Sequence, residues 1–135
     1  MLWYWVLLTT QSSGLSQMRD HRKLRAFELA DELVLAVYRV TKTFPKDEMF
    51  GLTSQVRRAS VSVASNIVEG CARQSQADFV RFLDMAFGSL REAEYQLTIA
   101  DRLGYTDPDE SKRLAGVADE AARVLAGLIK SLRKS

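Results

Sequence analysis

Apolar residues recur at steps of three and four along four separate stretches of this chain. That spacing places the apolar side chains on one face of an α-helix, which can then be buried against another helix. No stretch shows the sustained alternation of apolar and polar residues that is typical of a half-buried strand. We therefore predict an all-α protein with helices over about 21–44, 49–72, 76–103 and 108–132.

The residues between these stretches predict where the helices end. Pro45 ends the first helix, because the residue before a proline is disfavoured in the helical conformation. Gly70 stands near the end of the second helix, where a residue in the left-handed conformation would close it. Gly104 ends the third helix.

Two of the helix starts carry capping residues. Ser75, followed three residues later by Asp78, is a weak variant of a capping box and predicts the start of the third helix. Asp107 is the expected N-cap of the fourth, because Pro108 follows it with two acidic residues behind. Since the connections are short, we predict an antiparallel up-down-up-down four-helix bundle.

The chain reads as one domain with an N-terminal extension. Its 135 residues suffice for a single hydrophobic core, which we place in residues 18–135. Residues 1–17 begin MLWYWVLL, which is too short to span a bilayer and lacks the basic start and cleavage site of a signal peptide. We interpret them as an appended segment outside the core. The alternative is an apolar arm that docks onto a neighbouring subunit.

Composition indicates a soluble protein that is not a polycation. Hydrophobic residues make up 47% of the chain and charged residues 27%, as in ordinary globular domains. The net charge of +2 comes from 19 basic and 17 acidic residues, so a nucleic-acid surface would have to arise from their placement. A single cysteine, Cys71, excludes an intramolecular disulfide and favours a reducing, cytoplasmic location.

The residues of a catalytic or metal centre are missing from the sequence. His21 is the one histidine, so the Glu-x-x-His pairs of di-iron bundles cannot form. Phosphate-binding glycine loops and the nucleophile motif G-x-S-x-G are absent too. We expect a non-enzymatic protein without a metal or cofactor.

Basic residues gather in three places. They are His21, Arg22, Lys23 and Arg25 at the start of the first helix, Arg57 and Arg58 in the second, and Lys130, Arg133 and Lys134 at the C-terminus. In an up-down bundle the first and third clusters share one end, whereas the second falls nearer the other end or the middle. A basic end suits phosphate binding. The alternative is that these residues complement helix dipoles and keep the surface soluble.

A polar stripe runs beside the apolar face of the second helix. It comprises Ser62, Asn66, Glu69 and Arg73, and the third helix offers Ser89, Glu92 and Gln96 at similar steps, with Gly88 allowing a close approach. We hypothesise that the two stripes meet in a hydrogen-bonded network that fixes helix register or a contact between subunits. The alternative is a polar ligand pocket that includes Glu69 and Arg73.

Two segments resemble a known family. They are FGLTSQVRRASVSVASNIVEGCAR, residues 50–73, and FVRFLDMAFGSLREAEYQL, residues 79–97. Together they resemble the 23S rRNA intervening-sequence proteins, also called the S23 ribosomal protein family. The resemblance covers about 22–103, and the fourth helix by pattern alone. Two departures are Ala64, where the family often has proline, and Val68, where it often has alanine. Residues 1–17 have no counterpart.

The resemblance implies a ring-shaped homo-oligomer, commonly a pentamer, without enzymatic activity. The same superfamily includes the accessory variability determinant of diversity-generating retroelements, which binds nucleic acid and partners a reverse transcriptase. We therefore expect a bundle that binds RNA or RNA/DNA electrostatically. The alternative is a protein-interaction adaptor, such as a reverse-transcriptase accessory subunit, that does not itself recognise nucleic acid.

Overall fold

The computed structural model describes residues 19–134 and contains four α-helices in that range. They are α2 (Arg25–Thr41), α3 (Leu52–Cys71), α4 (Gln76–Arg102) and α5 (Pro108–Arg133), with short 3₁₀ turns η2 (His21–Lys23) and η3 (Lys46–Glu48). No strand occurs among these residues, which confirms the all-α prediction. The segment 1–17 interpreted above as an extension lies outside the described residues.

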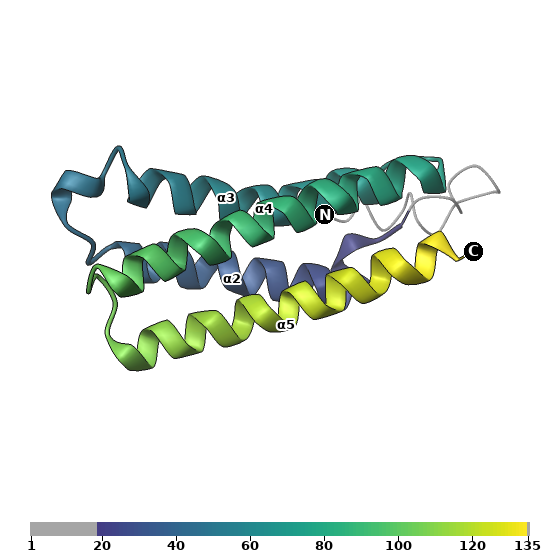
Figure 1. Ribbon diagram of the computed structural model, residues 1–135. Coiled ribbons are helices and arrows are strands. Elements are labelled where there is room, and N and C mark those ends of the chain that lie inside the picture. The colour runs from purple at the N-terminus through teal and green to yellow at the C-terminus, as the bar shows by residue number, and fades with distance from the viewer. Residues whose placement is uncertain (1–18, 135) are drawn as a thin grey trace.

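The helices form an antiparallel bundle in which each helix packs on two others (Figure 1). Helix α3 contacts α2 and α4, and α5 contacts α4 and α2, whereas the diagonal pairs have no Cα atoms within 8 Å of each other. The last turn of α5 lies at the same end of the bundle as the α3–α4 turn (Figure 1). We call this the terminal end. Hydrogen bonds from the Arg19 amide to the Cys71 carbonyl oxygen (3.2 Å) and from the Gln76 side chain to the Leu132 carbonyl oxygen (2.9 Å) hold it together.

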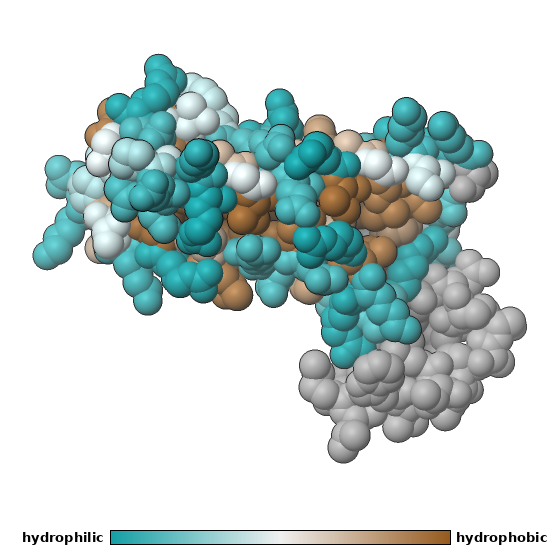
Figure 2. All heavy atoms as spheres, turned by 90° about the horizontal axis from the view of Figure 1, so that it is seen from below, coloured by the Kyte–Doolittle hydropathy of each residue, from teal (hydrophilic) through white to brown (hydrophobic). Residues whose placement is uncertain are grey.

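The core is aliphatic and draws on all four helices. Its largest fully buried side chains are Leu29, Leu33, Val37, Val56, Val63, Ile67, Leu83, Leu90, Leu114 and Leu125. Hydrophilic residues cover much of the surface, and apolar side chains show between them along the face that Figure 2 presents. Burial of these helix faces, at about 25 cal/mol per Å² of apolar surface, is the main stabilising term of such a bundle.

Three predicted helix boundaries are confirmed by their caps. The Ser75 hydroxyl accepts a hydrogen bond from the Asp78 amide (3.1 Å), and the Asp107 carboxylate accepts one from the Glu110 amide (2.8 Å). Gly104 adopts the left-handed conformation with φ of 77° after the end of α4. Each cap satisfies backbone groups that a helix end leaves without partners.

The first helix is shorter than predicted. Asp20 caps the separate turn η2 by accepting from the Arg22 amide, and Leu24 is extended, so α2 begins at Arg25. The apolar spacing continues through this break, because Leu24 and Phe27 still pack against the core. A prediction from periodicity alone therefore placed the start of this helix too far toward the N-terminus.

Two glycines have roles that the sequence misassigned. Gly70 is helical and buried, and a Cβ atom there would lie 2.9 Å from Cβ of Phe82, so it permits close packing of α3 on α4. Gly88 was expected to allow a close approach between helices or between subunits, and within this chain a Cβ atom there would meet nothing within 4 Å. Helix α3 ends at Cys71, and its C-cap residue, Ala72, is in a right-handed helical conformation.

Candidate functional site

The charges of the bundle are unevenly distributed between its two ends. The residues that meet at the terminal end, 19–24, 69–84 and 130–134, contain eight lysines and arginines and four carboxylates. The residues at the opposite end, 39–55 and 98–113, contain six of each. The terminal end thus has an excess of four positive charges, against an excess of two at the opposite end when Arg57 and Arg58, just beyond the counted range, are included.

Ion pairs hold two arginines of the first predicted cluster. The Asp20 carboxylate accepts hydrogen bonds from the Arg22 guanidinium (2.9 Å), and these lower the pKa of Asp20. Arg25 pairs with Glu120 across the α2–α5 interface (2.9 Å) and with Glu28 (3.5 Å). Their charges are offset locally, so Arg25 in particular is poorly placed to attract an external anion.

In the third cluster, one of the three basic residues pairs with a carboxylate of the described range and the two lysines do not. Arg133 pairs with Asp84 of α4. Lys130 and Lys134 are exposed and make no ion pair with residues 19–134, and the same holds for Lys23. These three lysines are therefore the residues of the predicted set that are most available to a phosphate.

Sequence reasoning missed a group of arginines stacked on aromatic rings at this end. The Arg19 guanidinium lies 4.1 Å from the ring centre of Phe79. Arg73 and Arg81 lie 4.6 Å and 4.7 Å from the ring centre of Phe82. Such stacking orders a guanidinium. The edges of these groups are also engaged: Arg73 pairs with Glu69 (3.5 Å), Arg81 pairs with Asp78 (3.6 Å), and Arg19 donates to the Arg73 carbonyl oxygen (3.1 Å). The available signal was the close spacing of Arg73, Phe79, Arg81 and Phe82 around a short turn.

The second cluster lies at the opposite end and is engaged internally. The Nε atom of Arg57 donates to the Thr41 hydroxyl (2.7 Å), and its guanidinium lies over the ring of Tyr38 (4.7 Å). Arg58 donates to the Ser54 hydroxyl (3.2 Å). The structure thus separates Arg57 and Arg58 from the terminal end, as the up-down arrangement predicts.

The predicted polar network is divided into three separate sets. The hydroxyl groups of Ser62 on α3 and Ser89 on α4 are hydrogen-bonded at 2.8 Å, and the Asn66 amide joins them through Ser62 Oγ (3.1 Å). The other four residues pair within their own helices, Gln96 with Glu92 (3.3 Å) and Arg73 with Glu69 (3.5 Å). The two stripes thus meet at one point, and no continuous network joins them among the described residues.

Two adjoining hollows form a groove between α4 and α5 at the terminal end. One, of about 360 Å³, is lined by Asp84, Phe87, Ala126, Ile129, Lys130, Arg133 and Lys134. The next, of about 470 Å³, is lined by Gln76, Ala77, Val80, Arg81, Asp84, Leu132 and Arg133. They share Asp84 and Arg133, whose ion pair crosses between the two helices. We call this feature the α4–α5 groove.

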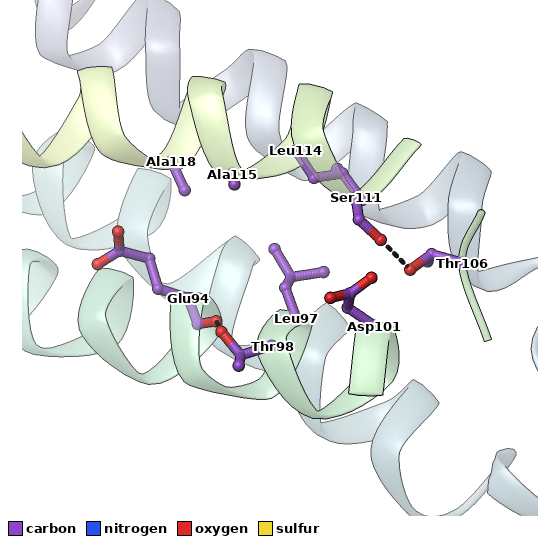
Figure 3. A pocket seen from close by; sticks show the side chains of 9 residues that line it. All are labelled: Glu94, Leu97, Thr98, Asp101, Thr106, Ser111, Leu114, Ala115 and Ala118. Atoms are coloured by element: carbon purple, nitrogen blue, oxygen red, sulfur yellow. Dashed lines mark hydrogen bonds between the residues drawn. The ribbon is translucent and has the colours of Figure 1, made fainter. Parts of the chain in front are cut away.

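A third pocket lies at the other end of the same helix pair (Figure 3). Its volume is about 160 Å³, and Glu94 and Asp101 project into it from α4, opposite Ser111 of α5. Burial raises the pKa of Glu94, and the Arg91 guanidinium partly offsets that effect. The interface between α4 and α5 is therefore acidic at this end and basic at the terminal end.

Cys71 is unsuited to act as a nucleophile. Its side chain is buried in the core cluster, and desolvation raises the pKa of the thiol to about 11. Histidine, cysteine and carboxylate side chains form no metal-binding group within residues 19–134. None of the helices in that range is long and apolar enough to span a membrane.

Comparison with known families identifies the family to which this chain belongs. The sequence model of the 23S rRNA-intervening sequence protein family matches residues 22–127. The chain belongs to this family. The matched range covers α2, α3, α4 and most of α5, but it ends before Lys130, Arg133 and Lys134. Those three residues and Arg19 are therefore features of this chain that the family match does not cover.

A solved structure from the S23 ribosomal protein family shares the fold. It is a protein of unknown function from Bacteroides thetaiotaomicron, 24% identical, covering 78% of this chain and 98% of its own, with a TM-score of 0.72. A comparison with curated proteins finds no match. In this member of the intervening-sequence family, α3 continues unbroken through Ala64 and Val68.

Proposed function

We propose that this chain is a non-enzymatic scaffold that binds RNA or an RNA/DNA hybrid electrostatically, as a homo-oligomer that is pentameric by analogy with its family. The observation that carries the proposal is the excess of four positive charges at the terminal end. Lysines without ion pairs among residues 19–134 are suited to phosphate oxygens, which accept hydrogen bonds and carry the negative charge, and the ring-stacked arginines add positive charge beside them.

Sequence-specific reading is not part of this proposal. The basic residues of the terminal end are spread over residues 19–23, the α3–α4 turn, the start of α4 and the end of α5, so no single helix presents a long basic face to a nucleic-acid groove. Backbone contacts alone give affinity with little base preference and with strong salt dependence. We therefore assign the terminal end a scaffolding role.

Self-association is supported by the outer face of α3. Residues 59–68 carry no charge, although Val61 and Val68 are 38% and 36% exposed. An open hollow of about 750 Å³ lies over this face, where Tyr38, Val61 and Ser62 are flanked by the charged residues Arg58 and Glu92. Uncharged exposed faces of this kind are typical of protein interfaces rather than solvated helices. A ring of subunits would place several terminal ends on one side and multiply the basic charge.

The test is a fluorescence-anisotropy titration of the full chain with structured RNA, single-stranded RNA and duplex DNA at low and physiological salt. Mass is measured on the same samples. We expect an oligomer whose affinity falls steeply as salt rises. The double variant Lys23→Glu, Lys134→Glu should bind more weakly and with a shallower salt dependence.

The matched control is the double variant Lys42→Glu, Lys46→Glu at the opposite end. It changes the net charge equally and should retain more of the affinity. Equal loss in both double variants would mean that net charge, and not the terminal end, governs binding. Absence of binding by an assembled oligomer at low salt would refute the nucleic-acid proposal.

A second candidate function is a protein-interaction adaptor, for example an accessory subunit of a reverse transcriptase. The observation that favours it is the apolar floor of the α4–α5 groove, which phosphate binding does not require. Binding to a protein partner that survives high salt would distinguish this function from electrostatic binding of nucleic acid.

A further inference from the structure

The α4–α5 groove combines an apolar floor with a basic rim. Ile129 is buried at its base, and Val80, Phe87 and Leu132 are half-buried and pack against the core from the groove side. Ala126 and Ala77 are exposed and small, so neither helix fills the space between the two. The floor thus offers apolar surface that the bundle itself leaves partly uncovered.

The rim carries four basic side chains and one carboxylate. They are Arg81, Lys130, Arg133, Lys134 and Asp84. The Arg133–Asp84 pair spans the groove, and Arg81 contacts Asp78 at 3.6 Å outside it, while Lys130 and Lys134 have no carboxylate partner within the described part of the chain. The rim is consequently positive, and its complement is a negatively charged ligand.

The length and shape of the groove fit a helix. Along α4 it runs from Gln76 to Phe87, which corresponds to about 17 Å, or three helical turns. Two antiparallel helices with small residues between them form a channel into which the side chains of a third helix can pack. A helix with apolar residues at steps of three and four would place one on the floor at each turn.

The chemistry of the floor distinguishes a peptide from a nucleic acid. Single-stranded nucleic acids are bound by stacking bases on several aromatic rings, and this floor has one ring, Phe87, among aliphatic side chains. Aliphatic floors are instead the usual partner of leucine-rich helix faces. The uncharged apolar segment MLWYWVLL of this chain would leave the basic rim without a partner.

We propose that the α4–α5 groove binds an amphipathic helix of a protein partner, with apolar residues facing the floor and acidic residues flanking them toward Lys130 and Lys134. The inference goes beyond nucleic-acid binding by the terminal end and names the kind of partner that this family member recruits. The Arg133–Asp84 pair lies where the bound helix crosses, and an acidic residue of that helix competes with Asp84 for Arg133.

The experiment measures binding of a labelled probe peptide to the full-length oligomer by fluorescence anisotropy. The probe is a helix-forming peptide of about 18 residues, with leucines at steps of three and four and glutamates beside them. A second probe has lysine in place of each glutamate, and an oligouridylate serves as the nucleic-acid competitor.

Two variants address the floor and the rim separately. Ala126→Trp fills the groove from an exposed helix position and leaves every charge in place. Lys130→Glu, Lys134→Glu reverses the rim, and Lys42→Glu, Lys112→Glu is the charge-matched control outside the groove. Circular dichroism of each variant verifies that the helices are retained.

We expect the acidic probe to bind, and each groove variant to weaken it by at least about tenfold. The control should change the affinity little, and the lysine probe should bind at least about tenfold more weakly than the acidic one. Because Ala126→Trp keeps the charge of the terminal end, RNA binding should survive in it while peptide binding is lost.

Four outcomes would overturn the proposal. The first is no binding of the acidic probe by the folded oligomer, and the second is binding that Ala126→Trp leaves unchanged. A third is loss of oligouridylate binding in Ala126→Trp, which would assign the groove to nucleic acid. The fourth is a smaller native mass of Ala126→Trp without any peptide, which would show that a second copy of this chain occupies the groove.

Discussion

Gly70 of α3 packs directly against Phe82 of α4. A Cβ atom at Gly70 would lie 2.9 Å from Cβ of Phe82 and 3.3 Å from the carbonyl oxygen of Phe79. Because one of these neighbours is backbone, α3 and α4 would have to move apart to admit a methyl group. We expect Gly70→Ala to lower the free energy of unfolding by about 1–3 kcal/mol, measured by urea denaturation.

The matched control is Gly88→Ala on the open face of α4, where an added Cβ atom meets nothing within 4 Å. Alanine is the better helix former, so this variant should gain up to about 1 kcal/mol. If Gly70→Ala were equally stabilising, the close contact of α3 with Phe82 would not exist in solution.

The Ser62–Ser89 hydrogen bond should be measurable as a coupling between α3 and α4. The variants Ser62→Ala, Ser89→Ala and the double variant form a thermodynamic cycle, with unfolding free energies from denaturant titrations. We expect a coupling of about 0.5–1.5 kcal/mol, the usual contribution of one hydrogen bond. A coupling near zero would mean that water replaces the bond at no cost.

Replacing Asn66 should cost less stability than it would if Asn66 joined a hydrogen-bonded network between α3 and α4. Its amide donates to the Ser62 carbonyl oxygen (2.9 Å) and hydroxyl (3.1 Å), both within α3. Asn66→Leu should therefore leave the contact between Ser62 and Ser89 in place and cost less than Gly70→Ala. Oligomer mass is measured alongside, because a changed mass would place Asn66 in a contact between subunits.

Glu48 makes the stability of the bundle depend on pH. Its carboxylate accepts hydrogen bonds from the Leu52 amide (2.9 Å) and the Tyr105 hydroxyl (2.8 Å), and these lower the pKa of Glu48 below its ordinary value of 4.5. The contribution is complete above that value and is lost as the pH falls through the lowered pKa. Glu48→Gln should lower the urea midpoint at neutral pH, and by less at a pH well below 4.5, where the carboxylate becomes protonated.

Tyr105→Phe provides the control for this effect. It removes the second donor and leaves the Leu52 amide in place, so the pH dependence should weaken but persist. A Glu48→Gln shift of the same size at both pH values would show that packing, and not ionisation, explains the loss.

Cys71 should be protected from alkylation until the bundle opens. Its thiol has a pKa of about 11, against an ordinary 9.0, so at pH 8 it holds roughly a hundredfold less thiolate than an exposed cysteine. We expect iodoacetamide to modify Cys71 slowly in buffer and rapidly in denaturant, as followed by mass spectrometry. Fast modification of the folded protein would mean that the α3 end opens readily.

Much of the local structure could be predicted from the sequence. The four helices, their antiparallel order and the caps at Ser75 and Asp107 depend on periodicity and on residues adjacent in the chain. The sharing of one end by the first and third basic clusters follows from the same order. The roles of Gly70 and Gly88 could not be distinguished from the sequence, because both glycines lie within helices. They differ only in their surroundings: Gly70 packs against α4, whereas Gly88 has no neighbouring atom within 4 Å of an added Cβ atom.

The candidate site depended far more on the tertiary structure. Sequence grouped Arg25 and Arg133 with the free lysines, but their partners Glu120 and Asp84 lie on other helices, where no sequence spacing reveals them. It grouped Arg73 with a polar stripe, and Arg73 does pair with Glu69 of that stripe, but the stacking of its guanidinium on Phe82 of α4 could not be predicted.

The sequence by itself determined that this chain forms four amphipathic helices with caps at defined residues, because helix formation and capping depend on neighbours within a few positions. Only the tertiary structure decided which charges remain available, where α4 and α5 leave a groove and which glycine is tightly packed. These properties arise from distances between side chains far apart in the chain, which are set by how the helices pack.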